Sequence, residues 1–334
     1  MMRYFGSKKT VIEDIYTIIS KKIPYGSLCD PFGGIATVGS YFKGKNFQVF
    51  SGDNLKFAYL FQVAKLEQNS TPLFRKLLHY LNLKNTQELK SLLNDLKIKD
   101  GWFVNNYSIL RKFFILENAR KIEACWQKIS LWNKKEILTF KENAILVASL
   151  INSMDKVANT AGTYYAYLKN WYRKALRPFR FEFLSHVKGN PNCKCYYCDA
   201  IDLVKLNSFD ILYLDPPYNE RSYASYYHLP ETIALDEIPK VHGKSGIPTT
   251  IHVRSPFNRR SEASNSLKNI LENSNFRLLV FHYFNEGIIK ETELLNLFGQ
   301  YGKLEKHVLC SKGYTNKNRN RDIKHNIYLV EKYA

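Results

Sequence analysis

The sequence predicts an α/β fold, in which a doubly wound, Rossmann-like sheet is interrupted by a mainly helical insert. Residues 26–53 follow the pattern strand, glycine-rich turn, helix, strand, which is one βαβ unit. Between about 57 and 190 apolar side chains recur at helical spacing, and after residue 196 short apolar strands return. We therefore expect residues 1–56 and 191–334 to form one domain around an inserted helical domain of residues 57–190.

The first part of the sheet domain can be assigned element by element. Residues 8–22 carry apolar side chains at helical spacing and predict a helix. The segment "GSLCDPFGG" indicates a short buried strand and a tight turn, and "ATVGSYFKGK" indicates the start of the next helix. The strand "FQVFSGDN" follows and ends on Asp53.

The insert contains two stretches dense in aromatic and basic side chains, at residues 101–129 and 160–181. After the insert, "CYYCD", "FDILYLD" and "FRLLVFHYF" predict strands, and residues 306–333 predict a hairpin. The chain therefore starts a sheet, leaves it for helices and returns to it.

Composition limits the class of protein. The 334 residues are 45% hydrophobic, which is enough for a sizeable core. No apolar run approaches the roughly 20 residues of a membrane helix, and the amino end lacks the apolar segment of a secretion signal. Six cysteines in a chain of this length do not resemble a secreted disulfide framework. We expect a soluble, cytoplasmic, reduced protein that is monomeric and does not bind a membrane.

Three of the cysteines are crowded together. Cys193, Cys195 and Cys198, with His186, could form a Cys3His zinc site. The C-x-C-x2-C spacing is cramped, however, and Cys198 is expected to face the core. We therefore expect no metal, with zinc as the alternative.

The formal net charge is +19, from 49 Lys and Arg against 30 Asp and Glu. A charge this large favours a polyanionic partner, most often nucleic acid. The alternative is an AT-rich genome, whose lysine codons raise the charge without purpose. The 23 tyrosines and 21 phenylalanines, several of them among basic residues, favour nucleic acid.

Ligands of a doubly wound sheet bind beyond the carboxyl ends of its parallel strands, where "DPFGG" lies. Gly33 and Gly34 allow close approach of the backbone, and Asp53 could accept both ribose hydroxyls of a nucleoside. Alone these features are weak, because Gly-Gly turns are common and an acid after a strand often caps a helix. A G-x-G-x-x-G spacing and a P-loop lysine are lacking, which disfavours dinucleotides and ATP phosphates.

The segment "DPPY", residues 215–218, ends another buried strand. The Asp215 carboxylate and the Pro216 carbonyl are two acceptors in a rigid place, since proline fixes φ. They could hold an amino group with two N–H donors, and Tyr218 could stack on its heterocycle. The alternative is a turn with a capping aspartate.

Together these residues resemble the Dam-like (alpha, D12 class) N6-adenine DNA methyltransferases, which use S-adenosylmethionine. The resemblance covers most of the chain, and its motifs are "RYFGSK" at 3–8, "DPFGG" at 30–34, Asp53, Asp199 in "CDAIDL" and "DPPY". The ordered set is far more specific than any member, since DPPY also occurs in N4-cytosine methylases. One departure is Ala36, where many relatives carry a second glycine.

The resemblance implies the site residues. S-adenosylmethionine would be bound by Tyr4, Lys8, Asp30, Phe32, Gly34, Asp53, Asp199 and Asp215, and catalysis would use Asp215, Pro216, Pro217 and Tyr218. A target adenine would be flipped out of double-stranded DNA, held at N6 by Asp215 and the Pro216 carbonyl, and stacked on Tyr218.

The insert would be the target-recognition domain of such an enzyme. DNA contacts are expected from Asn106, Tyr107, Arg111, Lys169 and Arg173, and from Arg254 and Arg259 in the loop 252–260. Tyr107 could fill the gap left by the flipped base. Residue by residue, the alternative is that many of these rings belong to a helix core and the basic side chains to a solvated face.

Three further segments, "NNYSILRKFFILENARKIE", "NTAGTYYAYLK" and "YHLPETIA", are similar to restriction-modification methylases like those paired with FokI and NlaIII. "YFNEG" at 283–287 is also similar, but His282 stands where a serine is expected. This subgroup implies protection of host DNA in a type II system, a CATG site, and a restriction endonuclease as a functional but not physical partner. Alternatives are an N4-cytosine or RNA methyltransferase, or a catalytically silent nucleic-acid-binding protein.

Overall fold

A computed structural model describes residues 2–97, 100–250, 254–284, 287–312 and 322–333. Contacts divide the chain into two compact units. The helical unit comprises Met1–Phe5, Leu55–His186 and Tyr223–His252, and the sheet unit comprises Gly6–Asn54, Val187–Ser222 and Val253–Ala334.

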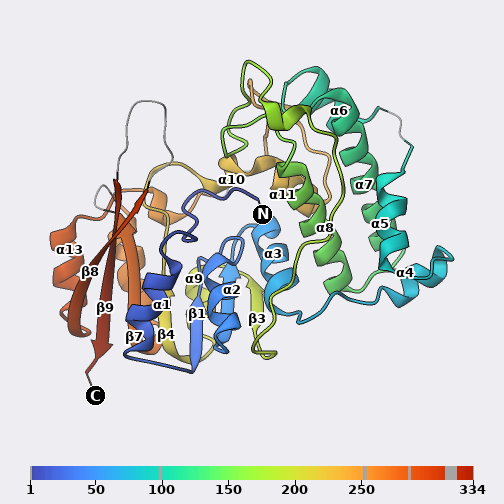
Figure 1. Cartoon of the computed structure of the whole chain (residues 1–334). Coiled ribbons are helices and arrows are strands. Elements are labelled where there is room, and N and C mark those ends of the chain that lie inside the picture. Colours follow the sequence, from blue (N-terminus) through green and yellow to red (C-terminus); the bar gives the residue numbers. More distant parts are fainter. Residues whose placement is uncertain (1, 98–99, 251–253, 285–286, 313–321, 334) are drawn as a thin grey trace. The chain divides into compact units, whose positions relative to one another are not determined.

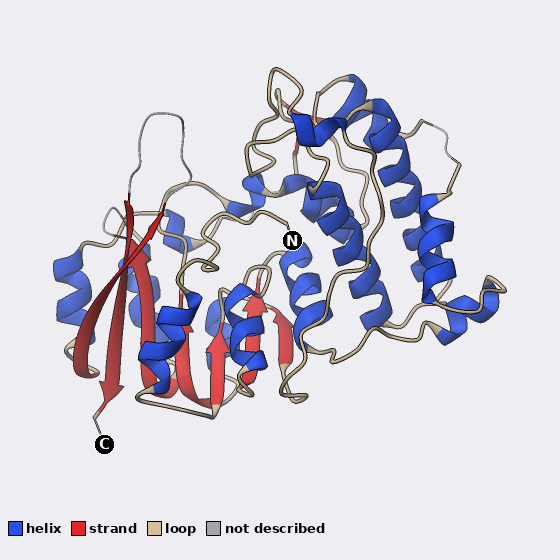
Figure 2. Ribbon diagram, viewed as in Figure 1, coloured by secondary structure: helices blue, strands red, loops and turns tan. Residues whose placement is uncertain are grey.

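The sheet unit contains a seven-stranded sheet in the order β3-β2-β1-β4-β7-β9-β8 (Figures 1 and 2). Its strands are β1 Ser27–Asp30, β2 Gln48–Asp53, β3 Lys194–Tyr197, β4 Ser208–Leu214, β7 Asn275–Phe284, β8 Gly302–Lys312 and β9 Asp322–Lys332. The first five strands in this order run parallel, and β9 and β8 are antiparallel to their neighbours. The predicted α/β class and Rossmann-like sheet are confirmed.

The helices of the sheet unit are α1 Ile12–Ser20, α2 Thr37–Gly44, α9 Ala200–Val204, η3 Pro256–Asn258, α12 Ala263–Glu272 and α13 Glu291–Phe298. Helix α1 buries Ile12, Ile15 and Ile19, in line with the predicted spacing. One core joins Leu212 of β4 with residues of β7 and α12 such as Phe281 and Leu267. The last four residues of β4 are all buried, as expected of a strand in the middle of a parallel sheet.

The helical unit contains α3 Lys56–Leu66, α4 Arg75–Tyr80, α5 Thr86–Asn94, α6 Trp102–Val104, the π-helical turn η1 Asn105–Ile109, α7 Leu116–Lys134, α8 Phe140–Asp155, η2 Arg173–Leu176, α10 Tyr223–Tyr226, α11 His228–Leu235 and the short strands β5 Val241–His242 and β6 Ile247–Pro248. Helix α8 packs against α3 and α7 and is buried over most of its length. Its start is fixed by a capping box, in which Thr139 and Glu142 exchange hydrogen bonds.

The helical unit takes in Tyr223–His252 as well as most of the predicted insert. Contacts divide a chain without assigning a role to its parts, so the target-recognition role of residues 57–190 stays a prediction. None of the helices in the described ranges combines the length and the apolar character needed to cross a membrane.

Candidate functional site

Four predicted acids follow neighbouring parallel strands at one edge of the sheet. Asp30 and Asp53 are the last residues of β1 and β2, Asp199 follows β3 by two residues, and Asp215 directly follows β4. Because the carboxyl ends of parallel strands meet at the same edge, the sheet gathers these acids there. Asp30 is close enough to Asp53 and Asp215 for both to act on its pKa.

The turn after β1 ties two of these strands together. The Gly34 N–H donates to Asp53 Oδ2 at 3.0 Å, and the Gly33 N–H donates to the Gly52 carbonyl at 2.9 Å. Gly34 has φ +49° and the buried Ala36 has φ +57°, both in the left-handed region. This conformation explains why a glycine is favoured at position 36, since an alanine there is strained.

Lys8 and Asp215 form an ion pair at the end of β4. Lys8 is 2% exposed and also donates from Nζ to the Gly6 carbonyl at 2.8 Å. The side chain of Asp215 is 19% exposed. Burial raises the pKa of Asp215, and the charge and hydrogen bond of Lys8 oppose that rise.

Asp30 lies beside this pair and is 2% exposed. Its Oδ1 is buried and has no hydrogen-bond partner among the described residues. Burial, and next the neighbouring carboxylate of Asp215, raise the pKa of Asp30 to about 8, against a hydrogen bond from the Phe32 N–H. Asp30 is therefore mainly protonated at neutral pH, and a neutral carboxyl can donate as well as accept a hydrogen bond.

The ring of Phe284 lies beside the ion pair and contacts Tyr218. The ring centroid of Tyr218 lies 4.3 Å from that of Phe284, at 44° between the planes. Lys8 Nζ lies 5.7 Å from the centroid of Phe284. Pro216 is buried, and Pro217 and Tyr218 are half-buried. Phe32 meets Phe257 edge-on, with centroids 5.3 Å apart.

Tyr4, the other end of the "RYFGSK" motif, belongs to the helical unit. Its ring stacks on Tyr227, with centroids 4.9 Å apart and 18° between the planes. The preceding residue is held by Asp155, whose Oδ2 accepts the Arg3 N–H at 3.1 Å. The motif thus spans the boundary between the units, and the structure does not bring Tyr4 to the acids within one unit.

Two predicted DNA contacts are buried inside the helical unit. Tyr107 is fully buried and donates its hydroxyl to the Gly246 carbonyl at 2.8 Å. Asn106 is 8% exposed and donates from Nδ2 to the Trp102 carbonyl at 2.9 Å. Arg111 Nη1 donates to the Asn106 carbonyl and Nη2 to the Gly243 carbonyl, both at 3.1 Å. These side chains hold the segment after β5, and their placement agrees with the alternative that they belong to a core.

The other predicted DNA contacts are exposed. Lys169 and Arg173 are exposed in the helical unit, near the exposed rings of Tyr165, Trp171 and Tyr172 in the sequence. In the sheet unit Arg254 donates to the Glu220 carbonyl at 3.0 Å, and Arg259 pairs with Glu262. Residues 252 and 253 of the predicted loop, and 285 and 286 of "YFNEG", lie outside the described residues.

The crowded cysteines of the sheet unit have ordinary partners. The Cys193 thiol donates to the Asn190 carbonyl at 3.3 Å, and all six cysteines of the chain are free thiols. Among the described residues, no three His, Cys, Asp or Glu side chains are grouped so as to hold a metal ion.

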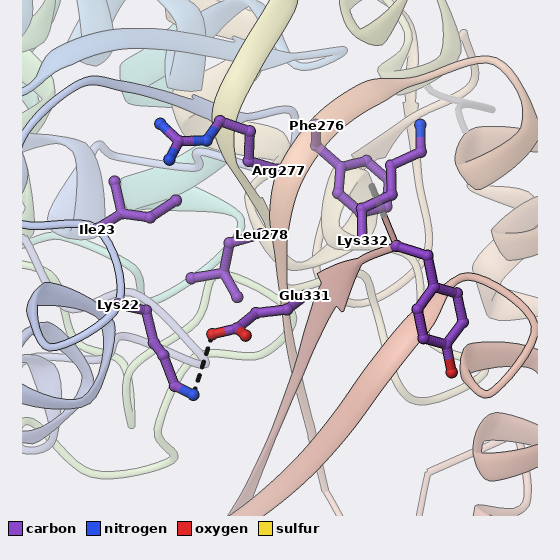
Figure 3. A pocket seen from close by; sticks show the side chains of 8 residues that line it. Lys22, Ile23, Phe276, Arg277, Leu278, Glu331 and Lys332 are labelled. Atoms are coloured by element: carbon purple, nitrogen blue, oxygen red, sulfur yellow. Dashed lines mark ion pairs between the residues drawn. The ribbon is translucent and has the colours of Figure 1, made fainter.

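A cavity of about 420 Å³ lies at the opposite end of the sheet, away from the acids (Figure 3). It is lined by Lys22, Ile23, Phe276, Arg277, Leu278, Glu331, Lys332 and Tyr333. Lys22 pairs with Glu331, and Arg277 with Asp210. Because its charges are largely paired and exposed, this cavity is a weaker candidate site than the carboxyl edge.

Sequence reasoning missed three buried polar side chains next to the ion pair: Tyr213, His282 and His325. Tyr213 is two residues before Asp215, and His282 was noticed only as a departure from the motif. The sequence does contain a signal for two of them. Tyr213 and His282 are polar residues within otherwise apolar predicted strands.

Comparison with known proteins identifies the family. The model of the D12 class N6 adenine-specific DNA methyltransferases matches residues 4–297. The type II methyltransferase M.FokI of Planomicrobium okeanokoites is 33% identical, over 94% of this chain and 49% of that protein. The modification methylase StsI of Streptococcus sanguinis is 30% identical, over 99% of this chain and 52% of that protein.

The type II methyltransferase M.NlaIII of Neisseria lactamica is 32% identical, over 91% of this chain and 90% of that protein. The chain therefore spans about half the length of the FokI and StsI relatives and most of the length of the NlaIII relative. The matched family model covers most of the chain, and so the chain belongs to the D12 class N6 adenine-specific DNA methyltransferase family.

Proposed function

We propose that this chain transfers a methyl group from S-adenosylmethionine to N6 of a flipped adenine in double-stranded DNA. The observation that carries the proposal is the ion pair of the buried Lys8 with Asp215, beside Pro216 at the carboxyl edge of the parallel sheet. Membership of the D12 class supports the reaction and the target atom.

Asp215 and Pro216 supply the two acceptors for the N6 amino group. The carboxylate of Asp215 accepts one N–H and the carbonyl of Pro216 accepts the other, so the nitrogen is held and oriented. Because a carboxylate accepts a hydrogen bond more strongly than a protonated carboxyl does, Lys8 assists by opposing the rise of the pKa of Asp215. Tyr218 provides a face on which the flipped base stacks, and flipping itself costs a few kcal/mol.

The residues of this edge fit S-adenosylmethionine. When bound, the cofactor supplies a methyl group on a sulfonium, which is already a strong electrophile. Asp53, fixed by the Gly34 N–H, suits the ribose hydroxyls. One buried oxygen of Asp30 has no hydrogen-bond partner among the described residues, and a polar group of a bound ligand could supply that partner. Proximity and orientation supply most of the acceleration.

Other cofactor contacts follow from the resemblance. We assign Lys8 and Phe32 to the cofactor site, Asp199 to the adenine of the cofactor, and, from the motif alone, Tyr4 to cofactor binding. Replacing Asp199 with alanine should weaken S-adenosylmethionine binding in calorimetry more than it slows transfer at saturating cofactor. The opposite pattern would remove Asp199 from the cofactor site.

We assign target recognition to the insert, residues 57–190, with Lys169 and Arg173 as exposed contacts. Arg254 and Arg259 of the sheet unit would grip phosphates. Each phosphate contact that is lost should lower the slope of log affinity against log salt by about one unit. Asn106, Tyr107 and Arg111 would act indirectly, by holding the segment between β5 and β6.

The biological role proposed is protection of host DNA in a type II restriction-modification system. The chain would act as a cytoplasmic monomer, with the endonuclease as a functional partner. The names of the FokI and NlaIII relatives support this role. The similarity to the NlaIII methylase also supports CATG as the narrower proposal for the site.

Expression in a host that lacks adenine methylation, followed by sequencing that detects modified bases, tests the role. N6-methyladenine at one recurring sequence would support it and give the site. Methylcytosine instead would favour the N4-cytosine alternative, and an unmodified genome from a strain producing soluble protein would count against DNA methylation.

A further inference from the structure

Three buried side chains of the sheet unit form a hydrogen-bonded chain. The Tyr213 hydroxyl lies 3.0 Å from His282 Nδ1, and His282 Nε2 lies 2.9 Å from His325 Nδ1. Tyr213 and His282 are fully buried, and His325 is 5% exposed. The three residues come from β4, β7 and β9, which are adjacent strands.

The chain of hydrogen bonds engages both ring nitrogens of His282. Burial, and next the nearby charge of Lys8, lower the pKa of both histidines, that of His325 to about 4, so both are neutral at physiological pH. A neutral imidazole has one donor and one acceptor nitrogen. If the Tyr213 hydroxyl donates to Nδ1 of His282, Nε2–H of His282 donates to His325, and in the other tautomer both bonds run the opposite way. Both nitrogens of His282 are then engaged, and its ring cannot rotate without breaking a buried hydrogen bond.

The two histidines contact the ring that supports Tyr218. The ring of His282 stacks against Phe284, with centroids 5.9 Å apart and 25° between the planes. The ring of His325 lies 5.0 Å from Phe284. Phe284 in turn contacts Tyr218 at 4.3 Å and lies under Lys8. An unbroken series of contacts therefore leads from Tyr213 to Tyr218.

We propose that His282 and His325, fixed by the Tyr213 hydroxyl, are positioning residues that set the plane of Tyr218 through Phe284. This inference rests on the proposed function, in which Tyr218 stacks on the target base. The ring that stacks on a flipped base must be held in position before the base arrives. An error in the position of the base is also an error in the position of its reacting N6 atom. A serine at position 282 has no ring to place against Phe284.

The first test observes the histidines directly, without cofactor or DNA. Nitrogen-15 NMR of the histidine-labelled protein should show His282 and His325 neutral at pH 7 and still neutral at pH 5.5. Tyr213→Phe, which removes only the hydroxyl, should shift the His282 nitrogens and leave His79 unchanged. The inference would be overturned if His282 titrates near pH 6.5, or if its nitrogen-15 shifts do not change in Tyr213→Phe.

The second test is a double-mutant cycle with Tyr218→Ala. Single-turnover methylation of unmethylated bacterial DNA should slow about 10-fold in Tyr213→Phe, with cofactor and DNA affinity within about 2-fold of wild type. In the Tyr218→Ala background, Tyr213→Phe should have no further effect, since both act through one ring. If Tyr213→Phe slows transfer equally in the wild-type and Tyr218→Ala backgrounds, Tyr213 does not act through Tyr218 and the positioning role is contradicted.

Tyr283→Phe is the matched control. Tyr283 is also buried, and its hydroxyl accepts the Ile289 N–H at 3.1 Å, within the core on the other face of β7. Tyr283→Phe should lower the melting temperature without changing the transfer rate. If Tyr213→Phe does not fold, His325→Phe keeps a ring against Phe284, removes the acceptor for His282 and takes its place in the cycle.

The two proposals fail separately. A wild-type protein that forms N6-methyladenine, with a Tyr213→Phe variant that is equally fast, contradicts the positioning role alone. A wild-type protein that forms no methylated base contradicts the proposed function, and the inference built on it then falls even if the NMR pattern is as expected.

Discussion

The two ends of the central sheet carry similar ionic groups in different surroundings. At the carboxyl end, the buried Lys8 pairs with Asp215, whose side chain is 19% exposed, next to the buried Asp30. At the amino end, Lys22 pairs with Glu305 and Glu331, and these three side chains are 28%, 33% and 43% exposed. Salt bridges therefore occur at both ends of one sheet.

The difference between the ends lies in burial and in unmet hydrogen bonds. Water screens the pairs at the amino end, where such pairs contribute little to stability. At the carboxyl end burial raises the pKa of Asp30 to about 8 and leaves one of its oxygens without a described partner. An ion pair alone does not indicate a functional site. A buried carboxyl with a raised pKa and one oxygen that lacks a described hydrogen-bond partner does indicate one.

Replacement of Asp215 should have the largest effect on this comparison. Asp215→Ala removes the proposed acceptor for N6, and we expect turnover to fall by roughly 10³-fold or more, while cofactor affinity changes by less than about 10-fold. Glu331→Gln, at the other end, should leave turnover unchanged. Steady-state rates and calorimetry measure both, and near-normal turnover in Asp215→Ala would contradict the mechanism.

Lysine-to-methionine substitutions compare the two ion pairs at matched size. Lys8→Met leaves Asp215 buried without its partner and should cost roughly 3 kcal/mol of unfolding free energy at pH 8, and less at pH 5, where Asp215 can protonate. The pH at which methylation reaches half its maximum should also rise. Lys22→Met should change neither quantity measurably. Equal losses of unfolding free energy in Lys8→Met and Lys22→Met would contradict the difference between the two ends of the sheet.

Asp30 and Asp210 should show opposite pH dependence of stability. The raised pKa of Asp30 means that its contribution is present below about pH 4 and is lost as pH rises toward 8, by at most about 1.4 kcal/mol per pH unit. Asp30→Asn should therefore gain stability relative to wild type as pH rises through this window.

Burial alone would raise the pKa of Asp210, but hydrogen bonds from Ser27 and Arg277 outweigh it and lower that pKa. The contribution of Asp210 is therefore present above about pH 4 and lost as pH falls further, so wild type should lose its advantage over Asp210→Asn on acidification. Urea unfolding from pH 8.5 down to pH 2 measures both pairs. If the unfolding free energies of wild type and Asp30→Asn change in parallel with pH, folding does not raise the pKa of Asp30.

The smallest expected effect concerns the turn after β1. Ala36→Gly relieves a positive φ and should stabilise the protein by up to about 1 kcal/mol. Ala58→Gly, inside helix α3, should destabilise by about 1 kcal/mol. Thermal melts compare the two, and a loss of stability in Ala36→Gly would mean that the alanine methyl group contributes packing that outweighs the strain.

Much of the sheet unit could be predicted from sequence, because its signals are local. A buried run that ends on an acid and a proline or glycine turn determines a strand, its end and the edge where Asp30, Asp53 and Asp215 lie. The fold class and the family followed from that pattern. The Lys8–Asp215 pair was not predicted, since spacing along the chain does not reveal which side chains meet.

The helical unit was harder to interpret. Asn106, Tyr107 and Arg111 have the residue types that read DNA, yet two of them are buried and all three bond to neighbouring backbone. A helical pattern does not tell which face a tertiary partner covers, and that partner, Tyr223–His252, comes from more than 100 residues later. His282 and His325 were missed for the same reason, because two strands far apart in sequence bring them together.

The most direct test is to incubate the purified chain with duplex DNA and S-adenosylmethionine, digest the DNA and identify the modified nucleoside by mass spectrometry. We expect N6-methyl-2′-deoxyadenosine, formed by wild type and by Lys22→Met but not by Asp215→Ala. N4-methylcytosine, or no methylated nucleoside from a protein that binds the cofactor, would contradict it.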